Sequence, residues 1–140
     1  MQDHPFALFA PFANALHVEL YDKADDLTMT KDLARVLGKN FATPKQVHGS
    51  RAIVACGAQM FGEEADAIAT NIPGLTLALC CADCQIWTIY APGKNVIGLA
   101  HAGWRGLMRG VLPSLYRLLQ KEWGIEPRSE EHTSELQSQR

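Results

Sequence analysis

The 140-residue sequence has no apolar run long enough to cross a membrane, no surplus of basic residues and no regular cysteine framework. Thirteen basic against fifteen acidic residues give a net charge of −2, which is not typical of nucleic-acid-binding proteins. Asp3 stands where a secretory signal would carry positive charge, so we expect a cytoplasmic protein. Three of the four cysteines, Cys80, Cys81 and Cys84, crowd together, which favours reduced thiols in core or ligand positions over disulfides.

Apolar residues make up 47% of the chain, enough to build the core of one domain. Residues 128–140 differ sharply, because they are polar and show no periodicity. Arg128–Ser138 resembles the in-frame translation of a common sequencing adapter, so we expect an artefact tail there. Residues 1–127 are then expected to be the N-terminal portion of a single domain that is truncated at its C-terminus.

Apolar runs and alternating patterns predict more strands than helices. The expected strands are Ala15–Tyr21, Arg51–Ala55, Leu75–Cys80, Ile86–Tyr90 and Val96–Ala100, with a short extended piece at Ala65–Thr70. Turns are expected at Pro73–Gly74 and over residues 92–95. Because the strands arrive next to one another instead of alternating with helices, the pattern favours an α+β fold, with mixed sheets flanked by helices.

Two helices are expected. A short one is capped by Thr28 or Thr30 and closed by Gly38, and a longer one covers Leu107–Trp123. Pro113 predicts a kink or a late start in the longer helix, since proline cannot donate a backbone hydrogen bond. The glycine-rich stretch HAGWRG before it is expected to be irregular.

Three reactive side chains lie at the edges of predicted strands: His48 in KQVHG, Cys84 in ADC and His101 in HAGWRG. Two imidazoles and a thiolate suit zinc, with copper as second choice, and three protein ligands leave a coordination position for water or substrate. The three residues lie too far apart in the sequence to form a local metal-binding motif. The residue types alone therefore leave two alternatives: ordinary loop histidines with a buried thiol, or a metal-free Cys84 nucleophile with His101 as its base.

Three neighbours are further candidates for the site. Asp83 could orient a ligand or bind substrate, or it could cap the tight bend beside Cys84. Arg105 could bind phosphate, or it could be a surface arginine. Trp104 could stack on a purine, or it could fill the core. Cys80 and Cys81 are expected to be small core residues.

Five blocks, KQVHG, ADAIAT, PGLTLALCCADC, VIGLAHAGWRG and GV, follow one another across Lys45–Val111. In order and spacing they resemble the multicopper polyphenol oxidase (laccase-like) family. Its members are also described as purine nucleoside phosphorylases with adenosine deaminase activity, and some as peptidoglycan editing factors. The resemblance implies zinc ligation by His48, Cys84 and His101. It also implies an α+β fold related to the catalytic domain of cytotoxic necrotizing factor toxins, which are cysteine deamidases.

The same resemblance implies a purine nucleoside and phosphate as partners, in a monomer or homodimer. The expected reactions are phosphorolysis of adenosine, inosine or methylthioadenosine, and hydrolytic deamination of adenosine. Cys84, Asp83 and Arg105 are the candidate catalytic residues, and Arg105 and Trp104 the candidate substrate contacts. The alternatives are a metal-free amidase, deamidase or editor of cell-wall precursors, and an inactive metal-binding fragment. A laccase is not expected, because one His-Cys-His set cannot supply several copper sites.

The sequence departs from the family in two places within its own length. An arginine that the family carries near the N-terminus is missing from Phe9–Ala13, which reads FAPFA, so phosphate or substrate binding through it is not expected. Cys81 stands where the family usually has threonine.

Overall fold

The computed structural model describes residues 7–21 and 30–126, and it divides the chain into two units, Met1–Gly38 and Lys39–Arg140. The expectation of an artefact tail at 128–140 lies outside the described residues. No described helix combines the length and the apolar character that crossing a membrane requires.

The first unit holds a 3₁₀ helix, η1 (Ala7–Phe12), and an α-helix, α1 (Thr30–Leu37). Gly38 ends α1 as predicted, with φ of 77° and its N–H donating to the carbonyl of Ala34 at 3.0 Å. Thr30 is the first residue of the helix and not its cap, and Thr28 lies outside the described residues.

The strand expected at Ala15–Tyr21 was wrong, because residues 16–21 form no regular structure. Alternation alone does not make a strand, since a strand also needs a partner for its backbone N–H and C=O groups. Among the described residues no strand pairs with this segment, and the N–H groups of Ala15 and Leu16 donate to the carbonyl of Phe12. Instead the polar side chains bond locally, with His17 Nε2 2.6 Å from a carboxylate oxygen of Glu19.

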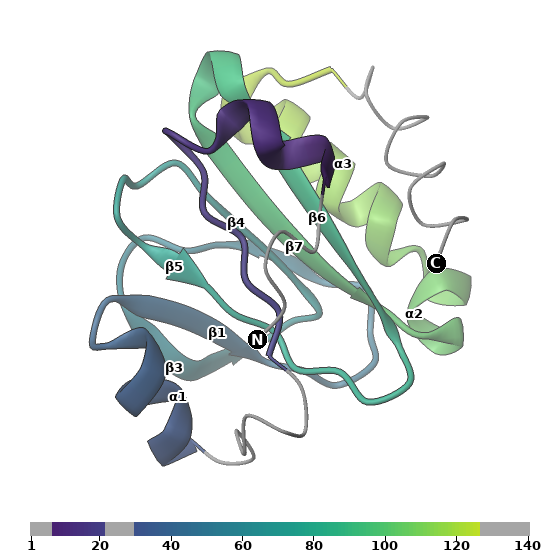
Figure 1. Ribbon diagram of the computed structural model, residues 1–140. Coiled ribbons are helices and arrows are strands. Elements are labelled where there is room, and N and C mark those ends of the chain that lie inside the picture. Colours follow the sequence, from purple (N-terminus) through teal and green to yellow (C-terminus); the bar gives the residue numbers. More distant parts are fainter. Residues whose placement is uncertain (1–6, 22–29, 127–140) are drawn as a thin grey trace. The chain divides into compact units, whose positions relative to one another are not determined.

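The second unit contains two sheets (Figure 1). The strands are β1 (Phe41–Lys45), β2 (Ala52–Val54), β3 (Gln59–Glu64), β4 (Ala67–Thr70), β5 (Thr76–Leu77), β6 (Gln85–Ala91) and β7 (Val96–Ala102). One sheet has the order β3-β1-β5 and is parallel. The other has the order β2-β4-β7-β6, with β2 parallel to β4 and the remaining pairs antiparallel. One parallel and one mixed sheet, together with the helices, confirm the α+β prediction.

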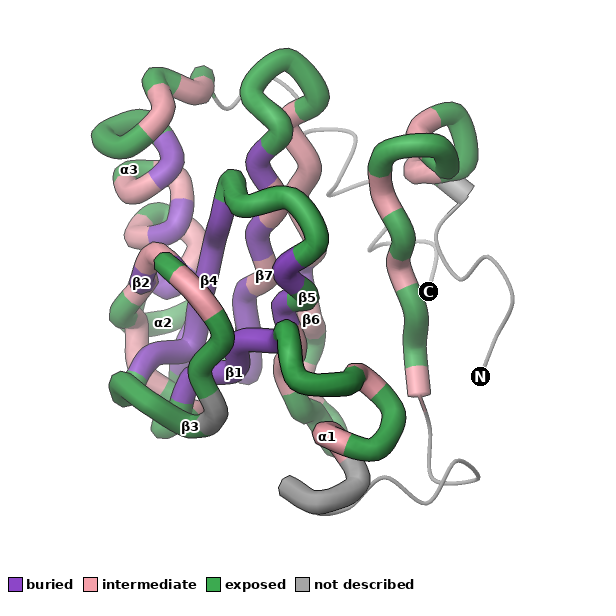
Figure 2. The backbone as a smooth tube through the Cα atoms, turned by 90° about the vertical axis from the view of Figure 1, so that its left-hand side faces the viewer, coloured by how far each residue is buried: buried purple, intermediate pink, exposed green. Residues whose placement is uncertain are grey.

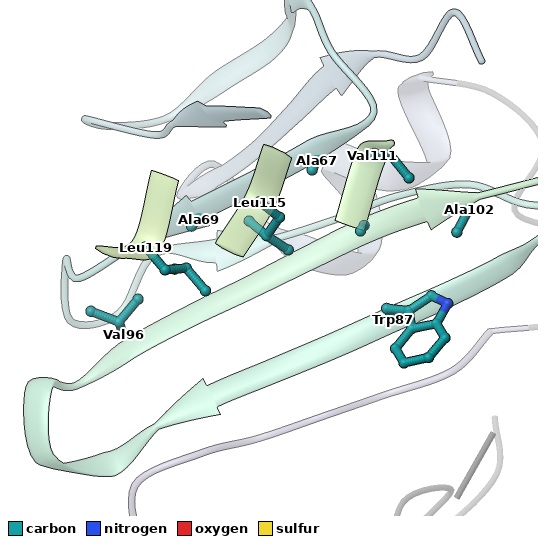
Figure 3. Close-up of a cluster of buried hydrophobic side chains, with 9 residues drawn as sticks. Ala67, Ala69, Trp87, Val96, Ala102, Val111, Leu115 and Leu119 are labelled. Atoms are coloured by element: carbon teal, nitrogen blue, oxygen red, sulfur yellow. The ribbon is translucent and has the colours of Figure 1, made fainter. Parts of the chain in front are cut away.

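Two cores flank the four-stranded sheet, because neighbouring residues of β4 point to opposite faces. On one face, α3 (Val111–Trp123) buries Val111, Leu115 and Leu119 against the small side chains of β4 and β7 (Figure 3). On the other face, Ile68 packs with residues of β2 and with the chain around β5. All of β4 is buried, and this places the strand in the middle of the unit (Figure 2).

The other expected strands occur, with shifted ends, at β2, β4, β6 and β7, and the 92–95 turn forms as the 3₁₀ helix η3 (Pro92–Lys94). The Pro73–Gly74 turn also forms. The strand expected at Leu75–Cys80 shrinks to Thr76–Leu77, and Cys80 and Cys81 are exposed, so placing them in the core was wrong. β1 and β3 were not predicted. Pro44 argues against a strand, yet it sits in β1 at a shift in register, where a missing N–H is tolerated.

HAGWRG was expected to be irregular, and this was wrong. Its first two residues belong to β7, and α2 (Trp104–Arg109) starts at its tryptophan. The late start of the long helix is confirmed, since α3 begins at Val111, after Gly110 at φ of 84°. Pro113 then lies in the first turn of α3, where no intrahelical partner is needed for its nitrogen.

We predict that Leu115→Ala lowers the free energy of unfolding by about 3 kcal/mol, because it removes a fully buried side chain and leaves a cavity between α3 and the sheet. The matched control is Leu107→Ala on α2, where the leucine is 46% exposed. That change is expected to cost less than about 1 kcal/mol. Urea unfolding of both variants would measure this, and equal losses would contradict the assigned core.

Candidate metal centre

The three predicted ligands come together in the second unit. Their ligand atoms, from His48, Cys84 and His101, all lie within 4.8 Å of one another. Cys84 directly precedes β6, and His101 lies opposite Ile86 in the neighbouring strand β7. His48 reaches the cluster from the loop after β1, and its ring stands edge-on to that of His101, with centroids 4.9 Å apart. Residues that are distant in sequence thus form one nitrogen/sulfur cluster.

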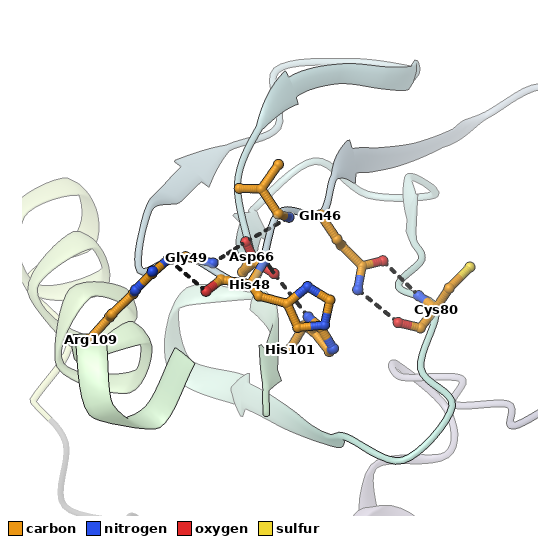
Figure 4. Close-up of polar contacts among 8 residues, drawn as sticks. Gln46, His48, Gly49, Asp66, Cys80, His101 and Arg109 are labelled. Atoms are coloured by element: carbon orange, nitrogen blue, oxygen red, sulfur yellow. Dashed lines mark hydrogen bonds and ion pairs between the residues drawn. The ribbon is translucent and has the colours of Figure 1, made fainter. Parts of the chain in front are cut away.

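Asp66 is the residue that organises this cluster, and the sequence analysis missed it. Its carboxylate is fully buried and accepts the ring N–H of His101 at Nδ1, 2.8 Å away. It also accepts three consecutive backbone N–H groups, from Val47, His48 and Gly49, at 2.9–3.0 Å (Figure 4). One carboxylate therefore fixes both the loop that carries His48 and the ring of His101.

The charge of Asp66 is stabilised by these contacts. Burial by itself would raise the pKa of Asp66, but the hydrogen bonds from His101 and from the three amides outweigh it and hold the pKa below its usual value. Because the folded-state pKa is the lower one, ionised Asp66 stabilises the fold above the ordinary aspartate pKa of about 3.9. That contribution is lost as the pH falls further.

The bond to Asp66 also decides which nitrogen of His101 faces the site. An ionised carboxylate only accepts, so Nδ1 carries the proton and Nε2 keeps its lone pair for a metal. His101 is 3% exposed, Cys84 is half-buried and His48 is exposed. The cluster is therefore anchored on one side and open to solvent on the other, as a site with a free coordination position requires.

The loop of His48 is held in a strained shape. His48 has φ of 58°, a left-handed conformation that costs energy for a residue other than glycine. Two contacts outside the loop offset this cost: the amide bonds to Asp66, and a bond from Nη1 of Arg109 in α2 to the carbonyl of His48 at 3.2 Å (Figure 4).

Gly103 leaves space for the Cys84 sulfur because glycine has no side chain. A Cβ at this position would lie 2.7 Å from the sulfur of Cys84 and 3.8 Å from the ring of His48, and the first contact is too close for real atoms. A glycine between β7 and α2 therefore allows the thiol to stand beside the two imidazoles. Tetrahedral zinc holds its nitrogen and sulfur ligands at about 2.0–2.3 Å, and the donor types and their closeness fit such an ion.

The other predicted site residues lie next to the cluster in sequence but outside it. Asp83 is exposed and is not among the clustered ligand atoms. Trp104 and Arg105 open α2, with the guanidinium carbon of Arg105 5.2 Å from the centroid of the Trp104 ring. Trp104 is 72% exposed, so it does not fill the core. Although Cys81 is exposed as a residue, partial burial of its thiol, followed by the nearby Cys84 and Cys80 thiols, raises the pKa of that thiol.

Residues 13–131 match the family described as multi-copper polyphenol oxidoreductase laccase, and the chain belongs to this family. The purine nucleoside phosphorylase YlmD of Geobacillus stearothermophilus is 34% identical over 135 residues, which cover 85% of this chain and 47% of that protein. A purine nucleoside phosphorylase of Deinococcus radiodurans is 38% identical over 96 residues, covering 64% and 37%. The chain thus spans less than half the length of these relatives.

Solved structures agree with this placement. The crystal structure of Geobacillus stearothermophilus YlmD superposes with a TM-score of 0.60 at 32% identity, covering 69% of this chain and 41% of that one. The Bacillus licheniformis protein YfiH gives a TM-score of 0.61 at 29% identity, with the same coverage. Both sequence relatives are named purine nucleoside phosphorylases.

We predict that Asp66→Asn lowers the free energy of unfolding of the metal-free chain by about 2–3 kcal/mol. The amide keeps the size of the side chain but turns one acceptor into a donor, which faces N–H groups that the carboxylate satisfies. Asp83→Asn is the control on an exposed carboxylate, with an expected change of less than about 0.5 kcal/mol. Denaturant titration at neutral pH measures both, and an unchanged Asp66→Asn chain would contradict the role given to this carboxylate.

Proposed function

We propose that the chain binds one zinc ion through His48, Cys84 and His101, and that this centre serves phosphorolysis of purine nucleosides and deamination of adenosine. The observation that carries the proposal is the cluster itself: three ligand atoms within 4.8 Å, one of them oriented by a buried carboxylate. The names of the relatives supply the substrate class. The chain spans less than half the length of those relatives.

The bound ion would supply Lewis acidity to the attacking oxygen of phosphate or water. The residues of this chain would do the rest. Asp66 accepts a hydrogen bond from the Nδ1–H of His101 and so leaves Nε2 of the ring to coordinate the ion. Trp104 presents an exposed indole directly after Gly103, a surface on which a purine can stack. Arg105 adds a cation beside it that can bind phosphate.

A second candidate rests on the same geometry. Cys84, His101 and Asp66 follow one another as a thiol, an imidazole and the carboxylate that orients it, which is the arrangement of a nucleophilic triad. Such a site would cleave amides or deamidate without a metal. Zinc and a free thiolate nucleophile exclude each other at Cys84, so the two proposals can be separated experimentally.

Removing the metal distinguishes the zinc centre from the metal-free triad. Adenosine turnover in the presence of phosphate is expected to stop when zinc is removed by a chelator and to return when zinc is added. Zinc is also expected to protect Cys84 from alkylation, whereas the exposed Cys56 remains reactive with or without the ion. Turnover that survives complete chelation but not alkylation would contradict the zinc centre and favour the triad. Zinc binding without turnover would limit this chain to holding the ion.

We predict that Gly103→Ala weakens zinc binding by about 10–100-fold while the fold is retained. The new methyl group displaces the Cys84 sulfur, which lies at the end of a short side chain and can move away from the histidines. Gly57→Ala is the matched control, since a Cβ there meets no atom within 4 Å. Competition with a chromogenic chelator gives the zinc Kd and thermal unfolding reports the fold; equal zinc affinity in the two variants would rule out the assigned site.

A further inference from the structure

We infer that Gln46 is a positioning residue, which fixes the segment carrying Cys84 against the loop carrying His48. The inference rests on the metal centre proposed above and concerns how its thiol ligand is placed. The side-chain amide of Gln46 donates from Nε2 to the carbonyl of Cys80 at 2.7 Å. The backbone N–H of Cys80 donates back to Oε1 at 2.8 Å (Figure 4). Both ends of the amide are thus used on one residue.

This pairing continues a strand ladder that the backbone cannot continue by itself. β1 and β5 pair in parallel, and the last backbone bond between their segments runs from the N–H of Ala78 to the carbonyl of Ala42. Further along β1, Pro44 has no N–H to donate. The Gln46 side chain then offers one donor and one acceptor to Cys80, as a paired backbone residue would.

The segment needs such a contact because packing does little to hold it. Residues 78–84 have no regular structure, and residues 80–83 are all exposed. Among the described residues, the two bonds between Cys80 and Gln46 are the only hydrogen bonds that join residues 79–84 to another part of the chain. Cys84 follows only four residues after Cys80, so fixing Cys80 restricts where the thiol can lie.

Gln46 is also attached to the rigid side of the site. It stands two residues before His48, and the amides of Val47, His48 and Gly49 are all bound by the buried carboxylate of Asp66. The chain of contacts therefore runs from Asp66 to the His48 loop, through the Gln46 amide, to Cys80 and on to Cys84. Asp66 positions the two imidazoles, and Gln46 ties the segment that carries the Cys84 thiol to the loop that Asp66 holds.

The decisive variant is Gln46→Met, which keeps the length of the side chain and removes both hydrogen bonds. Its matched control is Asn40→Leu, at the opposite end of the same strand pair. There the Asn40 amide donates to the carbonyl of Gly74 at 2.9 Å, far along the strand from the ligands. Both changes replace an amide that bonds a backbone group 34 residues away with an apolar side chain of similar size.

The zinc Kd of the full chain is the first measurement. Gln46→Met is expected to weaken zinc binding about 10–100-fold, and Asn40→Leu to leave it within about twofold of the unchanged chain. Gln46→Glu keeps an acceptor for the Cys80 N–H but loses the donor. Its zinc affinity is therefore expected to lie between those of Gln46→Met and Asn40→Leu. Zinc binding by Gln46→Met that equals the unchanged chain, or equal losses in Gln46→Met and Asn40→Leu, would overturn the inference.

Amide hydrogen exchange of the metal-free chain is the second measurement, and it does not depend on zinc. Gln46→Met is expected to speed exchange of the Cys80 amide, which loses its bond to Oε1 of Gln46, with little change in β4 and β7, while Asn40→Leu leaves the Cys80 amide as it was. If the unchanged chain binds no zinc, the proposed metal centre fails. The exchange comparison then still decides whether Gln46 fixes this segment: faster exchange supports it and unchanged exchange refutes it.

Discussion

The site depends on one buried carboxylate. Asp66 is fully buried and takes four N–H donors, one from the ring of His101 and three from the amides of residues 47–49. An isolated carboxylate at this position would be costly, and in this arrangement each donor reduces that cost. Asp66, the residue directly before β4, thus ties the loop of His48 to His101 near the end of β7. Without it, the left-handed backbone of His48 would have lost its main support.

Around this anchor the fold supplies two further conditions. The antiparallel pair β6–β7 sets Cys84 and His101 side by side, since the pairing of Ile86 with His101 leaves the residue before β6 next to the end of β7. Gly103 then lets the chain turn into α2 without touching the thiol. The small alanines of β4 and β7 allow α3 to lie close to the sheet that carries His101.

Sequence reasoning picked out the three residues that cluster but not the contacts that hold them together. His48, Cys84 and His101 are reactive residues at predicted strand edges, and a pattern of that kind can be recognised in one dimension. Asp66 was overlooked inside ADAIAT, although an acid in an apolar strand is itself a signal that partners must be nearby. Gln46 and Gly103 act through tertiary contacts that no local spacing reveals. The same limit explains two errors in the strand predictions. β1 was not predicted, because its proline is tolerated only where the register shifts. Ala15–Tyr21 was predicted from its alternation, but it pairs with no strand among the described residues.

The exposure gradient across the cluster argues for a working centre over a purely structural one. A structural zinc site closes around its ion with four protein ligands, whereas here His101 is buried, Cys84 is half-buried and His48 faces solvent. The same gradient would suit a thiol nucleophile, so geometry alone does not choose between the two chemistries. The support around the thiol does bear on the choice. The Cys84 sulfur lies within 4.8 Å of a ring nitrogen of each imidazole, yet a nucleophile needs only one base. A second imidazole, held in a strained loop by a buried carboxylate, has a role as a metal ligand and none in the triad, and this favours the ion.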